Sequence, residues 1–275
     1  MSSLRIKSLL LTLILLVVFL GIWEMSVQVP ERTEALTEYE LLIGGADQEA
    51  RVPPPSKVIA LAIQEISNPF YDAGPNDKGI GIQLGYSLYR VLSGFFFAFL
   101  IAIPLGFLIG MSPLMYQSLN PFIQILRPIS PLAWMPLALF VIKDSELSAI
   151  FVIFICSIWP MLANTAFGVA GVRQDWLKVA TTHELSPLRT AFTVILPAAA
   201  PTILTGMRIS IGIAWLVIVA AEMLVGGTGI GYYVWNEWNN LDLTSVIFSI
   251  VMIGLVGMML DLLLTGAIKL VEYKE

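Results

Sequence analysis

The sequence is poor in charge, cysteine and histidine, and each shortage excludes a class of protein. Only 13% of its 275 residues are charged, against ~25% in a typical soluble domain. The single cysteine, Cys156, excludes a disulfide framework and a thiolate metal site, and the single histidine, His183, excludes a histidine-rich metal centre. Acidic residues (20) outnumber lysine and arginine (15), which argues against a nucleic-acid binder because such proteins need a basic face.

Apolar residues make up 57% of the chain, too many for a surface that meets only water. Six runs are long enough to cross a hydrocarbon layer of ~30 Å as helices, and they do not alternate as transmembrane β-strands would. The sequence therefore predicts an all-α integral membrane protein with six transmembrane helices. The predicted spans are residues 8–29, 84–110, 121–142, 147–171, 197–225 and 244–270.

Lysine and arginine near the span ends predict the orientation. Placing the N-terminus inside gathers seven basic residues on the cytoplasmic face, and both termini are then cytoplasmic. These residues are Arg5, Lys7, Arg173, Lys178, Arg189, Lys269 and Lys274. No small-x-small cleavage site follows the first apolar run, so we expect an uncleaved anchor.

The spans predict two regions. Residues 1–83 would form an N-terminal anchor helix and an acidic periplasmic segment, with a short helix over 57–66. Residues 84–275 would form a five-helix core with a cytoplasmic loop at 172–196.

Motifs for catalysis are incomplete. His183-Glu184 begins like a zinc motif but lacks the second histidine, and the glycine run at 226–231 lacks the Lys-Ser/Thr of a phosphate-binding loop. We interpret the glycine run as a turn on the outer face. No catalytic residue, metal site or resident cofactor is predicted, and the chain is not expected to hydrolyse ATP by itself.

The cytoplasmic loop is long enough to suggest a docking function. Residues 175–182 can form a short helix, after which Ser186 suits an N-cap and Pro187 the first position of another helix.

This loop resembles the coupling loop of bacterial ABC importer permeases. The loop of that family carries Glu-Ala-Ala, a glycine four residues on and a terminal Ile-x-Leu-Pro. Ala180, Leu196 and Pro197 match this pattern. Lys178 replaces its Glu, Val179 replaces an Ala and Glu184 replaces the Gly. Permeases for nitrate, bicarbonate, taurine and alkanesulfonates also resemble the chain at residues 54–58, 87–94, 127–134, 204–208 and 220–224. Residues 68–72, 77–79 and 226–238 are more similar to the cyanobacterial nitrate and bicarbonate permeases.

The resemblance implies a type I ABC importer permease fold in the cytoplasmic (inner) membrane. It implies a second copy of the chain, two cytoplasmic ATPase subunits that hold ATP and Mg, and a periplasmic or lipid-anchored substrate-binding protein. The implied substrate is a small inorganic anion, nitrate or nitrite first, with bicarbonate, sulfonate or cyanate as alternatives. The ATPase-coupling residues would be Trp176, Leu177, Lys178, Val179, Ala180, Thr181, Thr182, His183, Glu184, Leu185, Ser186 and Pro187.

Polar and proline residues inside the spans indicate a translocation pathway. Pro128 follows Arg127 and would break or kink its helix, and broken helices in membranes border water or protein. Arg208 has two interpretations: it lends positive potential to an anion pathway, or it forms a structural ion pair with Asp261. The candidate pathway residues are Arg127, Pro131, Trp134, Met135, Asn164 and Arg208.

Glu222 lies near the outer end of its span, at a depth similar to that of Arg90. We expect these two residues to pair. Two other kinds of protein remain possible from the sequence: a self-contained anion channel or secondary transporter, and a membrane scaffold for which the loop is only a docking site.

Overall fold

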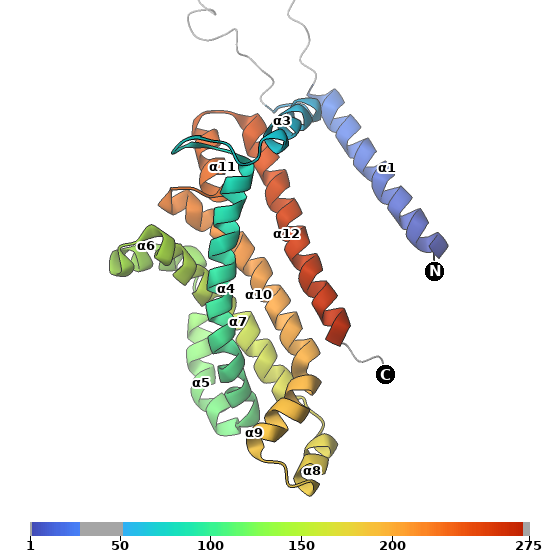
Figure 1. Ribbon diagram of the computed structural model, residues 1–275, viewed down its shortest axis with the longest axis vertical. Coiled ribbons are helices and arrows are strands. Elements are labelled where there is room, and N and C mark those ends of the chain that lie inside the picture. The colour runs from blue at the N-terminus through green and yellow to red at the C-terminus, as the bar shows by residue number, and fades with distance from the viewer. Residues whose placement is uncertain (1, 28–51, 272–275) are drawn as a thin grey trace, which may run out of the picture.

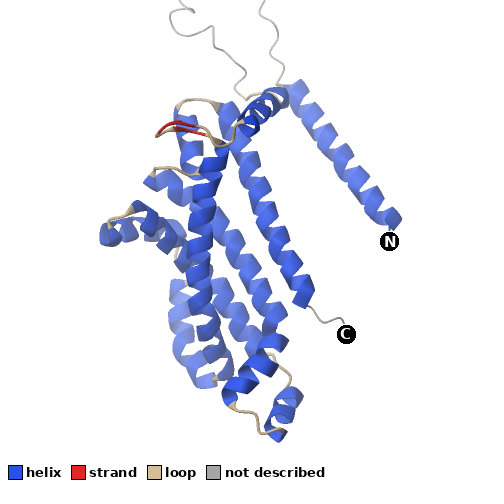
Figure 2. Cartoon of the chain, in the orientation of Figure 1, coloured by secondary structure: helices blue, strands red, loops and turns tan. Residues whose placement is uncertain are grey.

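The computed structural model describes residues 2–27 and 52–271, and nearly all of them are helical (Figures 1 and 2). Residues 28–51, which belong to the predicted acidic segment, and Lys274 lie outside the described residues. The elements in chain order are α1 (Ser2–Ser26), α3 (Pro55–Ser67), β1 (Asp72–Gly74), β2 (Asp77–Lys78), α4 (Ile80–Met111), α5 (Pro113–Leu126), α6 (Pro131–Ile142), α7 (Ser145–Ala170), α8 (Gln174–Thr182), α9 (Pro187–Thr190), η2 (Ala191–Ile195), α10 (Leu196–Val225), α11 (Ile230–Asn239) and α12 (Leu243–Val271).

Within the described chain, five helical segments are long and apolar enough to cross a membrane, and α5 with α6 makes a sixth when this bent pair is counted as one span. The all-α prediction and the count of six are therefore confirmed. The five segments cover residues 6–26, 80–111, 145–170, 187–225 and 243–270.

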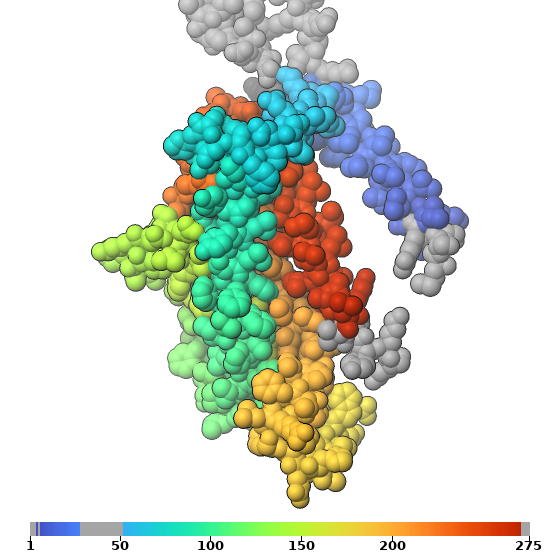
Figure 3. Space-filling view, viewed as in Figure 1, coloured from blue at the N-terminus to red at the C-terminus, as the bar shows by residue number. Residues whose placement is uncertain are grey.

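The span predicted over 121–142 is broken into two helices, as Pro128 predicted, and its first helix begins earlier, at Pro113. The axes of α5 and α6 differ in direction by 91°, and α6 projects from the side of the bundle (Figure 3). Pro128 explains the break, because it has no N–H to donate and its ring would meet the carbonyl of Gln124 in a continued helix. Pro131 then occupies the first turn of α6, a position that suits proline.

Helix α7 lies at the centre of the bundle, packed between α4 and α10 (Figure 1). Glycines let α4 approach it closely. A Cβ atom at Gly106 would lie 2.6 Å from Cβ of Thr165, and one at Gly110 would lie 2.7 Å from Cβ of Val169. The Gly-x-x-x-Gly spacing of α4 therefore serves a helix contact.

The end of the bundle that carries α8 and α9 matches the predicted loop. Ser186 caps α9 by accepting a hydrogen bond from the Arg189 N–H. Between α9 and α10 the helix widens into the π-helical turn η2, where the Leu196 N–H donates to the Ala191 carbonyl five residues back. The wider turn accommodates the ring of Pro197, which would collide with the Thr193 carbonyl in a regular α-helix.

The opposite end of the bundle is covered by α3, a short antiparallel hairpin of β1 and β2, and α11 (Figure 2). The helix predicted over 57–66 is confirmed as α3. Positive φ angles at Gly226 (79°) and Gly227 (93°) form the predicted turn. Residues 230–239, expected as loop, form α11.

Helix α1 stands apart from the other spanning helices (Figures 1 and 3), and its apolar window is entirely unburied. It contacts α3, where the Glu24 carboxylate accepts hydrogen bonds from the Ser56 N–H (3.1 Å) and hydroxyl (2.8 Å).

Candidate functional site

Two cavities adjoin the break between α5 and α6. The larger has a volume of about 750 Å³ and lies among α4, α5 and α7. The smaller has a volume of about 320 Å³ and is bounded by α6, α7 and α10. Arg127 and Ala163 line both cavities, so the two spaces meet at the end of α5.

Four of the predicted pathway residues line the smaller cavity: Arg127, Pro131, Trp134 and Asn164. They come from α5, α6 and α7, and the structure brings them together across about 40 residues of sequence. Asn164 is anchored by an amide N–H that donates to the Pro160 carbonyl at 2.8 Å.

The other two predicted pathway residues lie elsewhere. Met135 is only 1% exposed and packs in the hydrophobic core. Arg208 pairs with Asp261 through two hydrogen bonds, from Nε to Oδ1 at 2.5 Å and from a terminal nitrogen to Oδ2 at 2.6 Å. This bidentate pair, the structural alternative considered from the sequence, joins α10 to α12.

The two arginines of the bundle's middle therefore differ in their surroundings. The Arg208 guanidinium faces a carboxylate that cancels its charge. Among the described residues, the Arg127 side chain has neither a hydrogen bond nor an ion pair, and it is exposed at the junction of the cavities. Arg127 is thus the cation available to a solute in this space.

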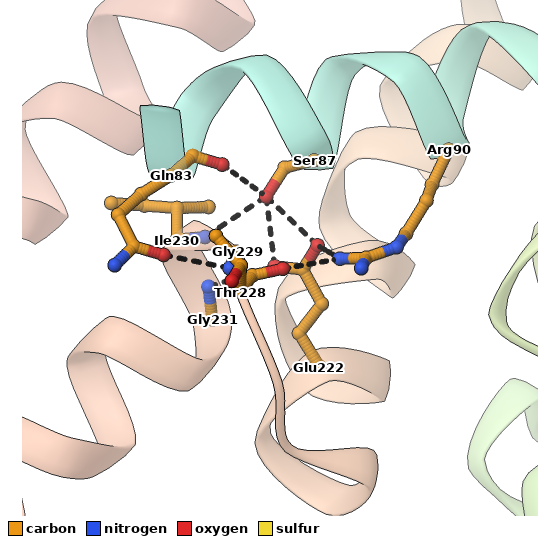
Figure 4. A network of polar contacts seen from close by, with 8 residues as sticks. All are labelled: Gln83, Ser87, Arg90, Glu222, Thr228, Gly229, Ile230 and Gly231. Carbon is orange, nitrogen blue, oxygen red and sulfur yellow. Dashed lines mark hydrogen bonds and ion pairs between the residues drawn. The ribbon is translucent and has the colours of Figure 1, made fainter. Parts of the chain in front are cut away.

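A buried polar network closes the α11 end of the bundle (Figure 4). Arg90 on α4 donates from Nη1 to Glu222 on α10 at 2.7 Å, and the side chains are only 9% and 2% exposed. The Ser87 hydroxyl lies 2.8 Å from each oxygen of the same carboxylate. The pairing of Glu222 with Arg90 was predicted, and the structure shows it.

The network also holds the chain that leads into α11 (Figure 4). The Gly231 N–H donates to Glu222 Oε2 at 2.9 Å, and the Gly229 N–H donates to Gln83 Oε1 at 2.7 Å. Arg90 donates a further hydrogen bond to the Thr228 carbonyl at 2.7 Å. Since α4, α10 and the start of α11 share one buried set of contacts, these elements are fixed to one another.

Sequence reasoning found the ion pair in this network but missed its backbone partners. The signal was present, because a glycine run next to a buried carboxylate offers N–H groups that no side chain obstructs. At Gly231 an added Cβ would lie 2.1 Å from the Val219 carbonyl oxygen.

At the other end, α8 presents an apolar surface beside a third cavity of about 440 Å³. Trp176 and Val179 are exposed, whereas Ala180 is buried against the rest of the chain. The Arg173 guanidinium lies 5.9 Å from the centroid of the Trp176 ring. The cavity is lined by Trp176, Val179, Ala180, His183, Leu185, Arg189 and Val194.

Comparison with known proteins places the chain in a family. Residues 102–274 match the family described as "Binding-protein-dependent transport system inner membrane component". The "Nitrate import permease protein NrtB" of Synechocystis sp. is 45% identical over 226 residues, which cover 82% of each chain. The "Bicarbonate transport system permease protein CmpB" of the same organism is 41% identical over 214 residues, covering 77% of this chain and 76% of that one.

A solved structure agrees on the fold. A chain of the MetNI methionine ABC transporter in an inward-facing conformation superposes with a TM-score of 0.62 at 16% sequence identity, covering 70% of this chain and 95% of that chain. Such components lie in the inner membrane and imply ATPase and substrate-binding partners. The chain belongs to the family of binding-protein-dependent transport system inner membrane components, the permease subunits of ABC importers.

Proposed function

We propose that the chain is the membrane-spanning subunit of an ATP-driven importer of a small inorganic anion, with nitrate or nitrite as the preferred substrate. The observation that carries the proposal is Arg127, whose guanidinium has no partner among the described residues and lies where two cavities meet. The named substrate of the 45% identical relative, nitrate, supports the choice of anion.

The position of Arg127 explains why an anion would occupy the site. The 14 residues of α5, rising ~1.5 Å each, put Arg127 ~21 Å from the start of the helix. A lone charge within a spanning segment is costly, and it marks an ion pathway or a water-filled cavity. An anion passing Arg127 would balance its charge, while a single cation would not hold that anion too strongly for release.

Bicarbonate is the second candidate substrate, because a bicarbonate permease subunit is 41% identical to the chain. Both anions are small, planar and singly charged, so the guanidinium of Arg127 suits either one. In this proposal the substrate-binding protein contributes most of the selection between them.

The remaining parts of the proposal concern assembly. Two copies of the chain would enclose the pathway, and two cytoplasmic ATPase subunits, which hold ATP and Mg, would dock at residues 176–187. The exposed Trp176 and Val179 on α8 supply an apolar contact for docking. This arrangement places both termini in the cytoplasm, the α8 end inside, and the α11 end outside beneath the binding protein.

The experiment compares uptake of labelled nitrate and labelled bicarbonate by cells lacking the chain and by complemented cells. We expect nitrate uptake to be lost and restored. Loss of bicarbonate uptake alone would change the substrate and keep the mechanism. If neither changes, the assignment of these anions is wrong.

A second arm separates an ATP-driven importer from a self-contained channel. Liposomes containing the purified chain alone should show no anion flux. Flux without partners or ATP would contradict the importer mechanism, and intact uptake in cells lacking the chain would favour a scaffold.

A further inference from the structure

The larger cavity has polar side chains on one wall only. Tyr116, Asn120 and Gln124 come from α5 and Arg127 is its C-cap; they are spaced four, four and three residues apart. This spacing places them on one face of the helix. The walls from α4 and α7 are formed by Ile109, Gly110, Leu162, Ala163, Ala166, Phe167 and Ala170.

These side chains have unused hydrogen-bonding capacity. In the described part of the chain, no hydrogen bond or ion pair involves the side chain of Tyr116, Asn120, Gln124 or Arg127, whereas Asn164 on α7 is bonded to its own helix. Polar side chains in spanning helices ordinarily bond across to a neighbouring helix. Here they line a cavity, so water or a polar solute must satisfy them.

The cavity is large enough for a hydrated ion. Its volume of about 750 Å³ equals that of roughly 25 water molecules in the liquid. The polar groups rise along it in steps of about 6 Å from Tyr116 to Asn120 to Gln124, then about 4.5 Å to Arg127, at the helical rise per residue. An oxyanion could pass from one donor to the next without losing all its contacts.

We propose that Tyr116, Asn120 and Gln124 form a release track along which the anion leaves Arg127 towards the α8 end of the bundle. This inference rests on the proposed function and names the residues that serve its release step. The track supplies donors without fixed charge: a phenol O–H and two carboxamide NH₂ groups. Neutral donors hold an anion less tightly than a guanidinium does, so they lower the cost of leaving Arg127 without adding a second tight site that would delay release.

The chemistry of the track also bears on selectivity. A carboxamide both donates and accepts, so it can serve nitrate, which only accepts, and bicarbonate, which also has an O–H to donate. The release track therefore conducts both anions. Removing one of its donors should slow both by a similar factor.

The test measures initial rates of labelled nitrate and bicarbonate uptake in cells lacking the chain and complemented with variants. Gln124→Leu and Asn120→Leu should each lower the maximal nitrate rate about fivefold, with little change in the half-saturating concentration, because one neutral hydrogen bond is lost after capture. Gln117→Leu is the matched control: it removes another exposed α5 glutamine that does not line the cavity. Its rate should stay within about twofold of wild type.

Two further variants separate transport from structure. Gln124→Asn keeps a donor and should retain more activity than Gln124→Leu. Gln124→Glu keeps the size but places a negative charge beside the route, so it should lose more than Gln124→Leu. The amount of chain in the membrane and its co-purification with the ATPase subunits should equal wild type for each variant.

Several outcomes would overturn the track. The track is overturned if Gln124→Leu and Asn120→Leu transport nitrate as fast as the control Gln117→Leu. If Arg127→Gln is impaired in the same experiment, the proposed function still stands. Loss of co-purification with the ATPase subunits, parallel to loss of uptake, would instead give this face of α5 a structural role in the assembly. Absence of nitrate and bicarbonate uptake with the wild-type chain would overturn the proposed function itself.

Discussion

The α11 end and the α8 end of the bundle are built in opposite ways. At the α11 end, Arg90, Glu222 and Ser87 are buried and bonded to one another and to backbone amides of the α11 segment. Towards the α8 end, Tyr116, Asn120 and Gln124 of α5 face a cavity and have no side-chain hydrogen bond within the described part of the chain. The bundle is thus cross-linked by buried polar contacts at one end and carries a cavity lined by polar α5 side chains towards the other.

The two ion pairs within the spanning helices differ in the same way, in how far their side chains are buried. Arg90–Glu222 is buried and locked into a network, whereas the side chains of Arg208 and Asp261 are 42% and 46% exposed. A buried pair becomes costly when one partner is removed, because the other charge is left without water. Each of the following changes tests one side of this comparison.

The largest expected loss of stability follows from breaking the cross-linked end. Glu222→Leu should lower the free energy of unfolding by about 3–5 kcal/mol, because it leaves the Arg90 guanidinium buried and unpaired. Thermal unfolding of the purified chain in detergent measures the effect. The double change Arg90→Met with Glu222→Leu should recover part of the loss, and a double variant as unstable as the sum of the single ones would contradict the pairing.

A smaller loss is expected from crowding the same network. Gly231→Ala would bring Cβ within 2.1 Å of the Val219 carbonyl oxygen, and such overpacking costs about 1–3 kcal/mol. Gly212→Ala is the control, since nothing lies within 4 Å of its added Cβ. Equal unfolding temperatures for the two variants would show that the start of α11 is not held tightly against α10.

The smallest effect concerns the pH dependence of the α11 end. Burial raises the pKa of Glu65 on α3, and the charges of Asp77 and Glu237 raise it further, against a backbone hydrogen bond from Ile80 that lowers it. The folded chain then binds a proton more readily than the unfolded chain, so stability falls as pH rises from 4.5 through the raised pKa. Glu65→Gln removes this titrating group, so the unfolding temperature should depend less on pH between about pH 4 and pH 7. Thermal unfolding measured across this range tests the prediction. An unchanged slope would assign the pH dependence to other groups.

Much of this contrast could be predicted from the sequence. The long apolar runs predicted the spans, and Ser186-Pro187 predicted the start of α9, because both signals are local. Similar depths in two spans predicted the Arg90–Glu222 pair. Position along a helix was enough for these features.

Other features depend on the direction in which one helix follows another, and the apolar runs of the sequence carry no information on that direction. The 91° turn between α5 and α6 follows from Pro128, but its angle depends on packing against α7. The cavity beside α5 depends on how α4, α5 and α7 pack, so its polar face was missed although the spacing of Tyr116, Asn120 and Gln124 was visible. Helix α11 was missed because its aromatic residues follow a glycine turn and resemble a membrane-surface loop.

The central claim is that Arg127, and not the neutralised Arg208, provides the charge that the anion meets. The most direct measurement compares nitrate uptake by Arg127→Gln with uptake by the double variant Arg208→Gln/Asp261→Asn, which removes the other cation together with its partner. A charged hydrogen bond contributes about 1.5–3 kcal/mol, so Arg127→Gln should lower the rate roughly ten- to a hundredfold. The double variant should stay within about threefold of wild type. A double variant impaired as severely as Arg127→Gln, or Arg127→Gln at the wild-type rate, would contradict the account.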